Sequence, residues 1–374
     1  MIYLDNAATT KPCPQCIKAV AEAMEESFGN ASSLHRMGTK SLQIISHAKK
    51  TVLDALAAGN RSFAARCEKG DVLFTSGATE SNNTALRGVA ENYSRSGNRI
   101  VSTAIEHPSV ARTLDSLAEK GYEIVRLAPK DYPDFEQGII DAVNETTMLV
   151  SVMAVNNETG FCVDVPRIYR EIKRKNPKTI VHIDAVQGFL KVPLEGDLIS
   201  FSGHKIHSSK GIGGLFVQNG IRIPPLLFGG GQQKNLRSGT EPCELIAGLD
   251  AAVNAYRYDR DFYFSLKNRL LDNLGKMENI GINSDDKCLP NIVNFSVRGV
   301  RSEIMLHSLE EEEIYVSSGS ACSKGKKSEV LSAFGVSDKD ADCAVRVSMC
   351  METTADDIDR LCEKIARTIE RVRR

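Results

Sequence analysis

The sequence of 374 residues contains no tryptophan, and aromatic residues make up only 6% of it. No apolar run is long enough to span a membrane, and residues 1–6 have neither the basic nor the apolar region of a signal peptide. The net charge of -1 shows no excess of either sign, which argues against nucleic acid or a membrane surface as the main partner. We therefore expect a cytoplasmic protein.

Several common catalytic and cofactor-binding motifs are also absent. The sequence contains neither HExxH nor GxSxG, and its glycine-rich stretches at 211–214 and 229–231 match neither GxGxxG nor GxxxxGK[ST]. The ten cysteines are scattered, and the one CxxC, from Cys13 to Cys16, has no second pair of ligands to complete a zinc site. We therefore expect no metal centre, and we do not favour a nicotinamide or ATP site.

Short apolar stretches alternate with amphipathic helical stretches from about residue 70 to residue 220. This alternation predicts an α/β fold with a mostly parallel central sheet covered by helices. The expected strands are 71–75, 99–104, 123–127, 148–154, 179–183, 198–201 and 214–217, with helices such as 110–119 and 165–175 between them.

After about residue 255 the pattern changes to α+β, and a chain of this length is expected to form more than one domain. The expected elements there are helices at 263–277 and 302–309, strands at 291–297, 314–316 and 344–348, and a C-terminal helix capped by Thr354 and Asp357. We predict a large domain of residues 15–255 and a smaller α+β domain made of residues 1–14 with 256–374.

Polar residues gather where the expected strands end, which is where open α/β sheets bind their ligands. Lys205 and Asp184 each follow such a strand, and His107 and Asn157 lie in polar clusters after two others. Residues 76–83 open a helix, where backbone N–H groups can hold a phosphate. Each cluster alone could be a turn, a helix cap or a core histidine. Together they predict one binding site.

Lys205 and Asp184 indicate which cofactor this site would bind. An enzyme that uses pyridoxal phosphate needs a lysine for a Schiff base, an acid for the pyridinium nitrogen and polar donors for the phosphate. Ser202 and His204 directly precede the lysine and are suitable donors. We therefore predict a pyridoxal 5'-phosphate enzyme that acts on an amine.

Two further residues bear on the reaction. Residues 317–328 contain no large apolar side chain, which predicts a surface loop. Cys322 lies there beside three lysines, and nearby cations favour the thiolate, so we predict a reactive cysteine. Arg346 lies in the alternating run 344–348, where it is either a surface ion-pair partner or a fork for a substrate carboxylate.

These motifs together resemble the cysteine desulfurases of the NifS/IscS kind, in the aminotransferase class V group of fold-type I pyridoxal phosphate enzymes. The resemblance extends from residue 3 to residue 359, and its most specific pieces are residues 76–83, 155–160, 202–205, 237–241 and 317–322. It implies a fold-type I transferase that converts L-cysteine to L-alanine and leaves a persulfide on Cys322 for transfer to an acceptor.

The resemblance implies a role for each matching residue. Lys205 would bind the cofactor and later move protons as the general base, Cys322 would attack the substrate sulfur, and His107 would stack on the cofactor ring. Asn157 and Arg346 would bind the substrate carboxylate. The residues implied in cofactor binding are Ala78, Thr79, His107, Asn157, Asp184, Gln187, Ser202, His204, Lys205 and Thr240.

The resemblance also implies a homodimer with shared active sites, in which Thr240 would reach the phosphate bound by the other subunit. The sulfur acceptor stays open between iron–sulfur cluster assembly, tRNA thiolation and cofactor biosynthesis. One alternative is a selenocysteine lyase or another enzyme of the same fold. A non-catalytic protein that binds the cofactor is a second alternative, which the intact set of Lys205, Asp184, His107 and Cys322 disfavours.

Overall fold

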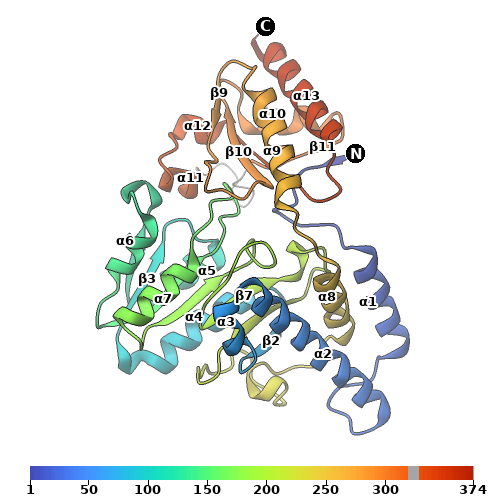
Figure 1. Ribbon diagram of the computed structural model, residues 1–374, viewed down its shortest axis with the longest axis vertical. Helices are drawn as coiled ribbons and strands as arrows, with labels where there is room; N and C mark the ends of the chain where they lie inside the picture. The colour runs from blue at the N-terminus through green and yellow to red at the C-terminus, as the bar shows by residue number, and fades with distance from the viewer. Residues whose placement is uncertain (319–327, 374) are drawn as a thin grey trace.

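The computed structural model describes residues 1–318 and 328–373 and has two lobes (Figure 1). Among these residues, the larger lobe contains a seven-stranded sheet with the strand order β2-β8-β7-β6-β5-β3-β4. Its strands are β2 (Asp71–Thr75), β3 (Arg99–Thr103), β4 (Glu123–Leu127), β5 (Thr147–Met153), β6 (Ile180–Asp184), β7 (Leu198–Ser202) and β8 (Gly213–Val217). Only β8 runs antiparallel to its neighbours β2 and β7, so the predicted mostly parallel sheet is confirmed.

Helices cover both faces of this sheet, because successive side chains of a strand point to opposite sides. Ile100 and Leu149 belong to an apolar cluster with α4 (Ala78–Tyr93) and α5 (Pro108–Ala118). The next residues along the same strands, Val101 and Val150, belong to the cluster on the other face. The helices of that cluster are α2 (Arg36–Gly59), α3 (Arg61–Cys67), α6 (Phe135–Ala142), α7 (Val165–Lys175) and α8 (Cys243–Ala255), and α1 (Pro14–Glu26) packs on α8.

The smaller lobe is α+β and is built from both ends of the chain. Its antiparallel sheet has the order β12-β10-β9, and the N-terminal strand β1 pairs in parallel with β11. Its elements are β1 (Ile2–Tyr3), α9 (Arg260–Leu274), β9 (Ile280–Ile282), β10 (Ile292–Val297), α10 (Ser302–Glu310), β11 (Ile314–Tyr315), α11 (Glu329–Ala333), α12 (Asp338–Asp342), β12 (Ala344–Ser348) and α13 (Ala355–Arg373). Ile2 and Leu4 lie in the same apolar core as Ile365 of the last helix.

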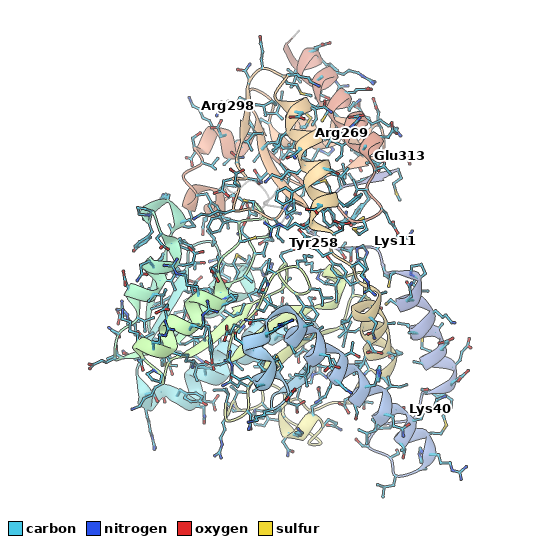
Figure 2. The ribbon with its side chains drawn as sticks, in the orientation of Figure 1. Lys11, Lys40, Tyr258, Arg269, Arg298 and Glu313 are labelled. Atoms are coloured by element: carbon cyan, nitrogen blue, oxygen red, sulfur yellow. The ribbon has the colours of Figure 1, made fainter. Side chains whose placement is uncertain are left out.

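The two lobes meet around Tyr258, whose side chain packs against the cores of both. Figure 2 shows Tyr258 and Lys11 at the level of this junction, with Arg269 and Arg298 on the smaller lobe.

The four short 3-10 helices of the described residues are η1 (Ser94–Ser96), η2 (Pro129–Asp131), η3 (Gly203–Lys205) and η4 (Gln233–Asn235). The proposed domain boundaries near residues 15 and 255 stay a prediction.

The predicted strands agree with the observed ones to within one or two residues. The helix expected at 263–277 begins earlier, at Arg260, because the Asp259 carboxylate accepts a hydrogen bond from the Phe262 N–H at 3.0 Å and caps it. The predicted cap of the last helix is confirmed, since Thr354 and Asp357 bond each other's backbone N–H groups at 2.8 and 3.1 Å. The long helix α2 was absent from the predicted elements.

Candidate active site

The ends of β5, β6 and β7 lie where the smaller lobe meets the larger one. Asp184 is the last residue of β6, and Lys205 lies in η3 directly after β7. Asn157 follows β5, and its backbone oxygen accepts a hydrogen bond from Arg346 of β12 at 2.9 Å. Residues that the sequence separates by up to 189 positions therefore lie together at one end of the sheet.

Asp184 is buried at this edge, with 3% of its surface exposed. Its Oδ2 accepts a hydrogen bond from Asn82 Nδ2 of α4 at 2.8 Å, and its Oδ1 accepts one from the Val186 N–H at 3.0 Å. Asn82 also donates to Ser109 Oγ at 2.9 Å. The sequence prediction did not include Asn82, although it lies in the polar stretch 76–83.

Lys205 is half-buried and points to the start of the chain. Its Nζ donates to the backbone oxygens of Ala7 and Ala8 at 2.6 and 2.8 Å. Gln187 Nε2 donates to the same Ala7 oxygen at 2.8 Å. The N-terminal segment, defined here as residues 5–10, thus crosses the site, and its Ala7 oxygen alone accepts from two of the predicted site residues.

The two predicted histidines, His107 and His204, both lie close enough to Lys205 to feel its charge. His107 caps α5, and its Nδ1 accepts a hydrogen bond from the Ser109 N–H at 3.1 Å. Partial desolvation by the surrounding protein lowers the pKa of His107. His204 Nδ1 lies 3.2 Å from Thr9 Oγ1, and burial together with the Lys205 charge lowers the pKa of His204 to about 4. Both shifts favour the neutral imidazole.

Residues 77–79 form the start of α4 beside the end of β7. Gly77 is the N-cap residue with φ of +151°, a conformation that favours glycine, and it provides no side-chain acceptor for the first turn. Ala78 is half-buried and Thr79 is exposed. A methyl group added to Gly77 would lie 3.8 Å from Ser202 Oγ, so the Ser202 hydroxyl is next to this helix start.

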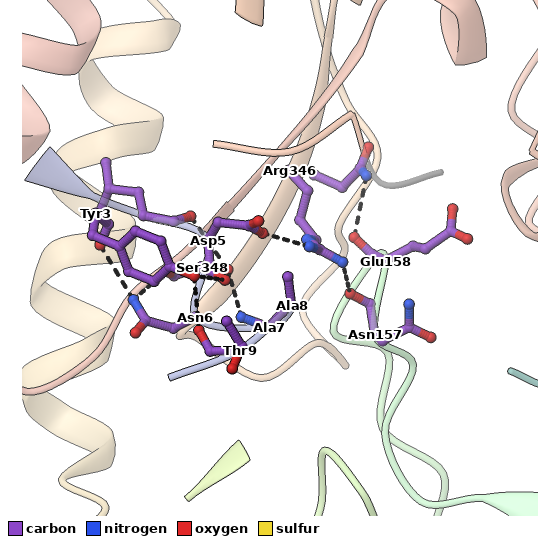
Figure 3. A network of polar contacts seen from close by, with 12 residues as sticks. Tyr3, Asp5, Asn6, Ala7, Ala8, Thr9, Asn157, Glu158, Arg346 and Ser348 are labelled. Atoms are coloured by element: carbon purple, nitrogen blue, oxygen red, sulfur yellow. Dashed lines mark hydrogen bonds and ion pairs between the residues drawn. The ribbon is translucent and has the colours of Figure 1, made fainter. Parts of the chain in front are cut away.

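Arg346 is almost completely buried, with 4% of its side chain exposed. Its Nη2 pairs with Asp5 Oδ1 at 2.6 Å, and its Nη1 donates to the Asn157 oxygen (Figure 3). Its Nε is buried without a hydrogen-bond partner. The sequence left open whether Arg346 is a surface ion-pair partner, and the burial rules that alternative out. A buried guanidinium with a remaining N–H can receive a carboxylate.

Glu106 is a second buried acid that the sequence prediction missed. Its Oε1 accepts hydrogen bonds from Thr103 Oγ1 at 2.6 Å and from the Met153 N–H at 2.9 Å, while its Oε2 is buried without a partner. Burial, together with the charge of Asp184, raises the pKa of Glu106 to about 8. The position of Glu106 directly before His107 was the available sequence evidence that it belongs to the site. An acid next to a strand end is usually exposed, however, so this position alone did not indicate a buried residue.

Two predicted site residues are not tested by these contacts. Thr240 is exposed in the single chain. Cys322 lies outside the described residues.

Among the described residues, no helix is long and apolar enough to cross a membrane. No group of three or more His, Cys, Asp or Glu side chains in the described part of the chain could hold a metal ion.

The raised pKa of Glu106 predicts a pH-dependent stability. A buried acid with a raised pKa stabilises the fold while it is protonated, and this contribution is lost as the pH rises from about 4.5 through about 8. At about 1.4 kcal/mol per pKa unit, we expect Glu106→Gln to gain several kcal/mol of unfolding free energy relative to the wild type between pH 5 and pH 9. Urea unfolding of the cofactor-free protein at each pH measures this difference.

Glu80→Gln is the matched control. Burial raises the pKa of Glu80, but the hydrogen bonds that it accepts from Arg237 and Ser76 lower it below its usual value. The contribution of Glu80 to the unfolding free energy is therefore constant above pH 6. If the unfolding free energies of the wild type and of Glu106→Gln changed in parallel with pH, the Glu106 carboxyl would be ionised at neutral pH. That result would contradict this interpretation.

Comparisons with known proteins agree with this geometry. Residues 2–361 match the aminotransferase class V family. The chain is 35% identical to the cysteine desulfurase IscS of Klebsiella pneumoniae, over 100% of this chain and 93% of that protein. It is also similar to the solved structure of a NifS-like protein, with a TM-score of 0.88 and 31% identity over 99% of each chain.

A further solved structure, described as SspA in complex with cysteine, is similar with a TM-score of 0.79 and 28% identity. The match covers 93% of this chain and 99% of that one. The fold, the order of the site motifs and these full-length similarities agree with one another. The chain therefore belongs to the aminotransferase class V family.

Proposed function

We propose that this protein is a pyridoxal 5'-phosphate-dependent cysteine desulfurase. It would take sulfur from L-cysteine, release L-alanine and hold the sulfur as a persulfide on Cys322. The observation that carries the proposal is that Lys205 and Arg346 both bind residues 5–8, which lie beside the strand ends that carry Asp184 and Lys205. The similarity to the Klebsiella pneumoniae desulfurase and to a protein solved with cysteine supports the choice of substrate.

The described residues fit the cofactor. Asp184 offers a buried carboxylate for the ring nitrogen, and Lys205 offers a primary amine 2.6–2.8 Å from neutral backbone oxygens. The start of α4, with Ala78 and Thr79, together with Ser202 offers donors for a phosphate. We assign Gln187 to the ring hydroxyl, His107 to the ring face and His204 to the phosphate. When bound, the cofactor supplies an electron sink next to the amino-bearing carbon.

The protein residues would orient the substrate and move its protons. Arg346, through its unpartnered Nε, and Asn157 would hold the α-carboxylate of L-cysteine. The Lys205 amine would take and return protons at the substrate carbons. The Cys322 thiolate would attack the substrate sulfur, so that an S–S bond forms and the C–S bond breaks. The electron pair of that bond passes to the substrate carbon, which is protonated to give alanine.

We further propose a cytoplasmic homodimer that passes its sulfur to a separate acceptor protein. The nine described cysteines are all free, as expected in a reducing compartment. Phe28, Leu34 and Phe228 expose between 75% and 102% of their surface in the single chain, an amount of apolar exposure that favours a second copy as the partner. Thr240, also exposed, would then reach the phosphate site of the other subunit.

The decisive experiment removes the proposed nucleophile. We expect Cys322→Ala to bind the cofactor normally but to form alanine and sulfide from L-cysteine at least 100-fold more slowly, because no thiolate receives the sulfur. Absorption spectra measure cofactor binding, and alanine release in the presence of a reductant measures turnover. Cys350→Ala, which removes a half-buried cysteine, is the control with unchanged rates. Full activity of Cys322→Ala would instead favour a selenocysteine lyase or another enzyme of this fold.

A second prediction concerns the carboxylate site. Arg346→Lys keeps the charge but loses the planar fork, so we expect the KM for L-cysteine to rise at least 10-fold with a smaller change in kcat. Arg298→Lys is the control, because Arg298 makes a forked pair with Asp340 on the surface of the smaller lobe at 2.7 and 3.2 Å. An unchanged KM in Arg346→Lys would remove Arg346 from the substrate site.

A third prediction concerns the phosphate end of the site. A methyl group on Gly213 of β8 would lie 2.7 Å from the Gly77 Cα and must displace the start of α4. We expect Gly213→Ala to weaken the binding of pyridoxal phosphate at least 10-fold, as measured by titration of the cofactor-free protein. Gly59→Ala is the control, because no atom lies within 4 Å of its added methyl group. Equal affinities would show that the α4 start does not contact the phosphate.

A further inference from the structure

The described chain on both sides of residues 319–327, the stretch that contains Cys322, is attached to the Arg346 site. On the N-terminal side, the backbones of Ser317 and Arg346 exchange hydrogen bonds of 3.2 and 2.6 Å. On the C-terminal side, Ser328 Oγ donates to Glu158 Oε2 at 2.7 Å, and both residues are buried. These two attachments belong to one cluster, because Glu158 directly follows the Asn157 whose oxygen binds Arg346.

Glu158 is held firmly by its own backbone. Its N–H donates to Asn156 Oδ1 at 2.9 Å, and its oxygen accepts from Asn294 Nδ2 at 3.1 Å. Its side chain is buried, which raises its pKa to about 7, while the hydrogen bond from Ser328 and the charge of Arg346 oppose this rise. Burying a carboxyl group is unfavourable unless it serves a contact, and among the described residues that contact is Ser328.

Ser328 is fixed from both directions. It is the N-cap residue of α11, where its Oγ accepts a hydrogen bond from the Leu331 N–H at 3.1 Å. Its single hydroxyl proton is directed to Glu158. The position of Ser328 is therefore set jointly by the start of a helix in the smaller lobe and by a carboxyl group in the turn after β5.

We propose that Glu158 is a positioning residue for sulfur transfer, which acts through Ser328. One peptide unit, from Asn157 to Glu158, touches the substrate-binding arginine with its oxygen and the chain leading to the nucleophile with its side chain. Glu158 thereby fixes Ser328, where the described chain resumes after residues 319–327, relative to the Arg346 site that would bind L-cysteine. Because a misplacement of about 1 Å can slow a reaction about 100-fold, losing this contact slows sulfur transfer. The inference rests on the proposed function.

The test compares four variants of the cofactor-loaded enzyme with L-cysteine. We expect Glu158→Ala to lower kcat for alanine formation at least 10-fold with the KM within twofold of the wild type. Glu158→Gln retains kcat within threefold, because its amide oxygen still accepts from Ser328. Ser328→Ala lowers kcat like Glu158→Ala, and the double variant Glu158→Ala with Ser328→Ala shows no further loss, as expected for two residues that share one contact.

A purely structural role is tested by a matched helix cap. Ser337 is the N-cap residue of the neighbouring helix α12, where its Oγ accepts from the Asp340 N–H at 3.2 Å, and it does not contact Glu158. Ser337→Ala removes a comparable cap, so we expect a lowered Tm with unchanged kcat. Mass spectrometry of persulfide on Cys322 after one equivalent of L-cysteine gives a second measure, which should fall in Glu158→Ala and not in Ser337→Ala.

Three results would overturn the inference. The first is an unchanged kcat in Glu158→Ala, the second is an equal loss in Ser337→Ala, and the third is a raised KM in place of a lowered kcat. Cys322→Ala separates this failure from a failure of the proposed function. If Cys322→Ala is inactive and Glu158→Ala is normal, only the positioning role is wrong. If Cys322→Ala is active, the desulfurase assignment itself is wrong.

Discussion

The ion pair between Asp5 and the buried Arg346 joins the beginning and the end of the chain at the candidate site, and the other contacts depend on it. Arg346 is 4% exposed on its side chain, so removing its partner would leave an uncompensated charge in the protein interior. With Asp5 fixed, the N-terminal segment lies across the ends of β6 and β7. Its Ala7 and Ala8 oxygens then receive the Lys205 amine. The smaller lobe thus sets the position of Lys205, the lysine proposed to be catalytic.

The site contains three buried acids with different surroundings. Asp184 accepts hydrogen bonds from two donors, an arrangement that suits a carboxylate. Glu106 has an unpartnered oxygen, and burial raises its pKa to about 8, so it is neutral at pH 7. Glu158 lies between these cases, with a pKa of about 7 and one hydroxyl partner. The protein therefore places a carboxyl group with two fixed donors where the ring nitrogen would lie, and it uses the other two acids as hydrogen-bonding groups.

The sequence predicted the central sheet well because its strands are short, apolar and bounded by polar residues, as in β2 at Asp71–Thr75. It did not predict α2, whose buried face includes the small residues Gly38, Ser41 and Ala48 as well as large apolar ones. In the site, it identified Lys205 and Asp184 from residue type and position at a strand end. It missed Asn82 and Glu106, because their importance depends on burial and on partners 102 and 47 positions away.

The sequence by itself determined the layered α/β fold, the order of the site motifs and the types of reactive groups, because these depend on local apolar patterning and residue chemistry. Only the tertiary structure decided that Arg346 is buried against Asp5 and that residues 5–10 cross the site. It also decided that Glu158 holds Ser328. These contacts join stretches more than 150 residues apart, and their energies depend on burial and distance. No local sequence pattern records those two quantities.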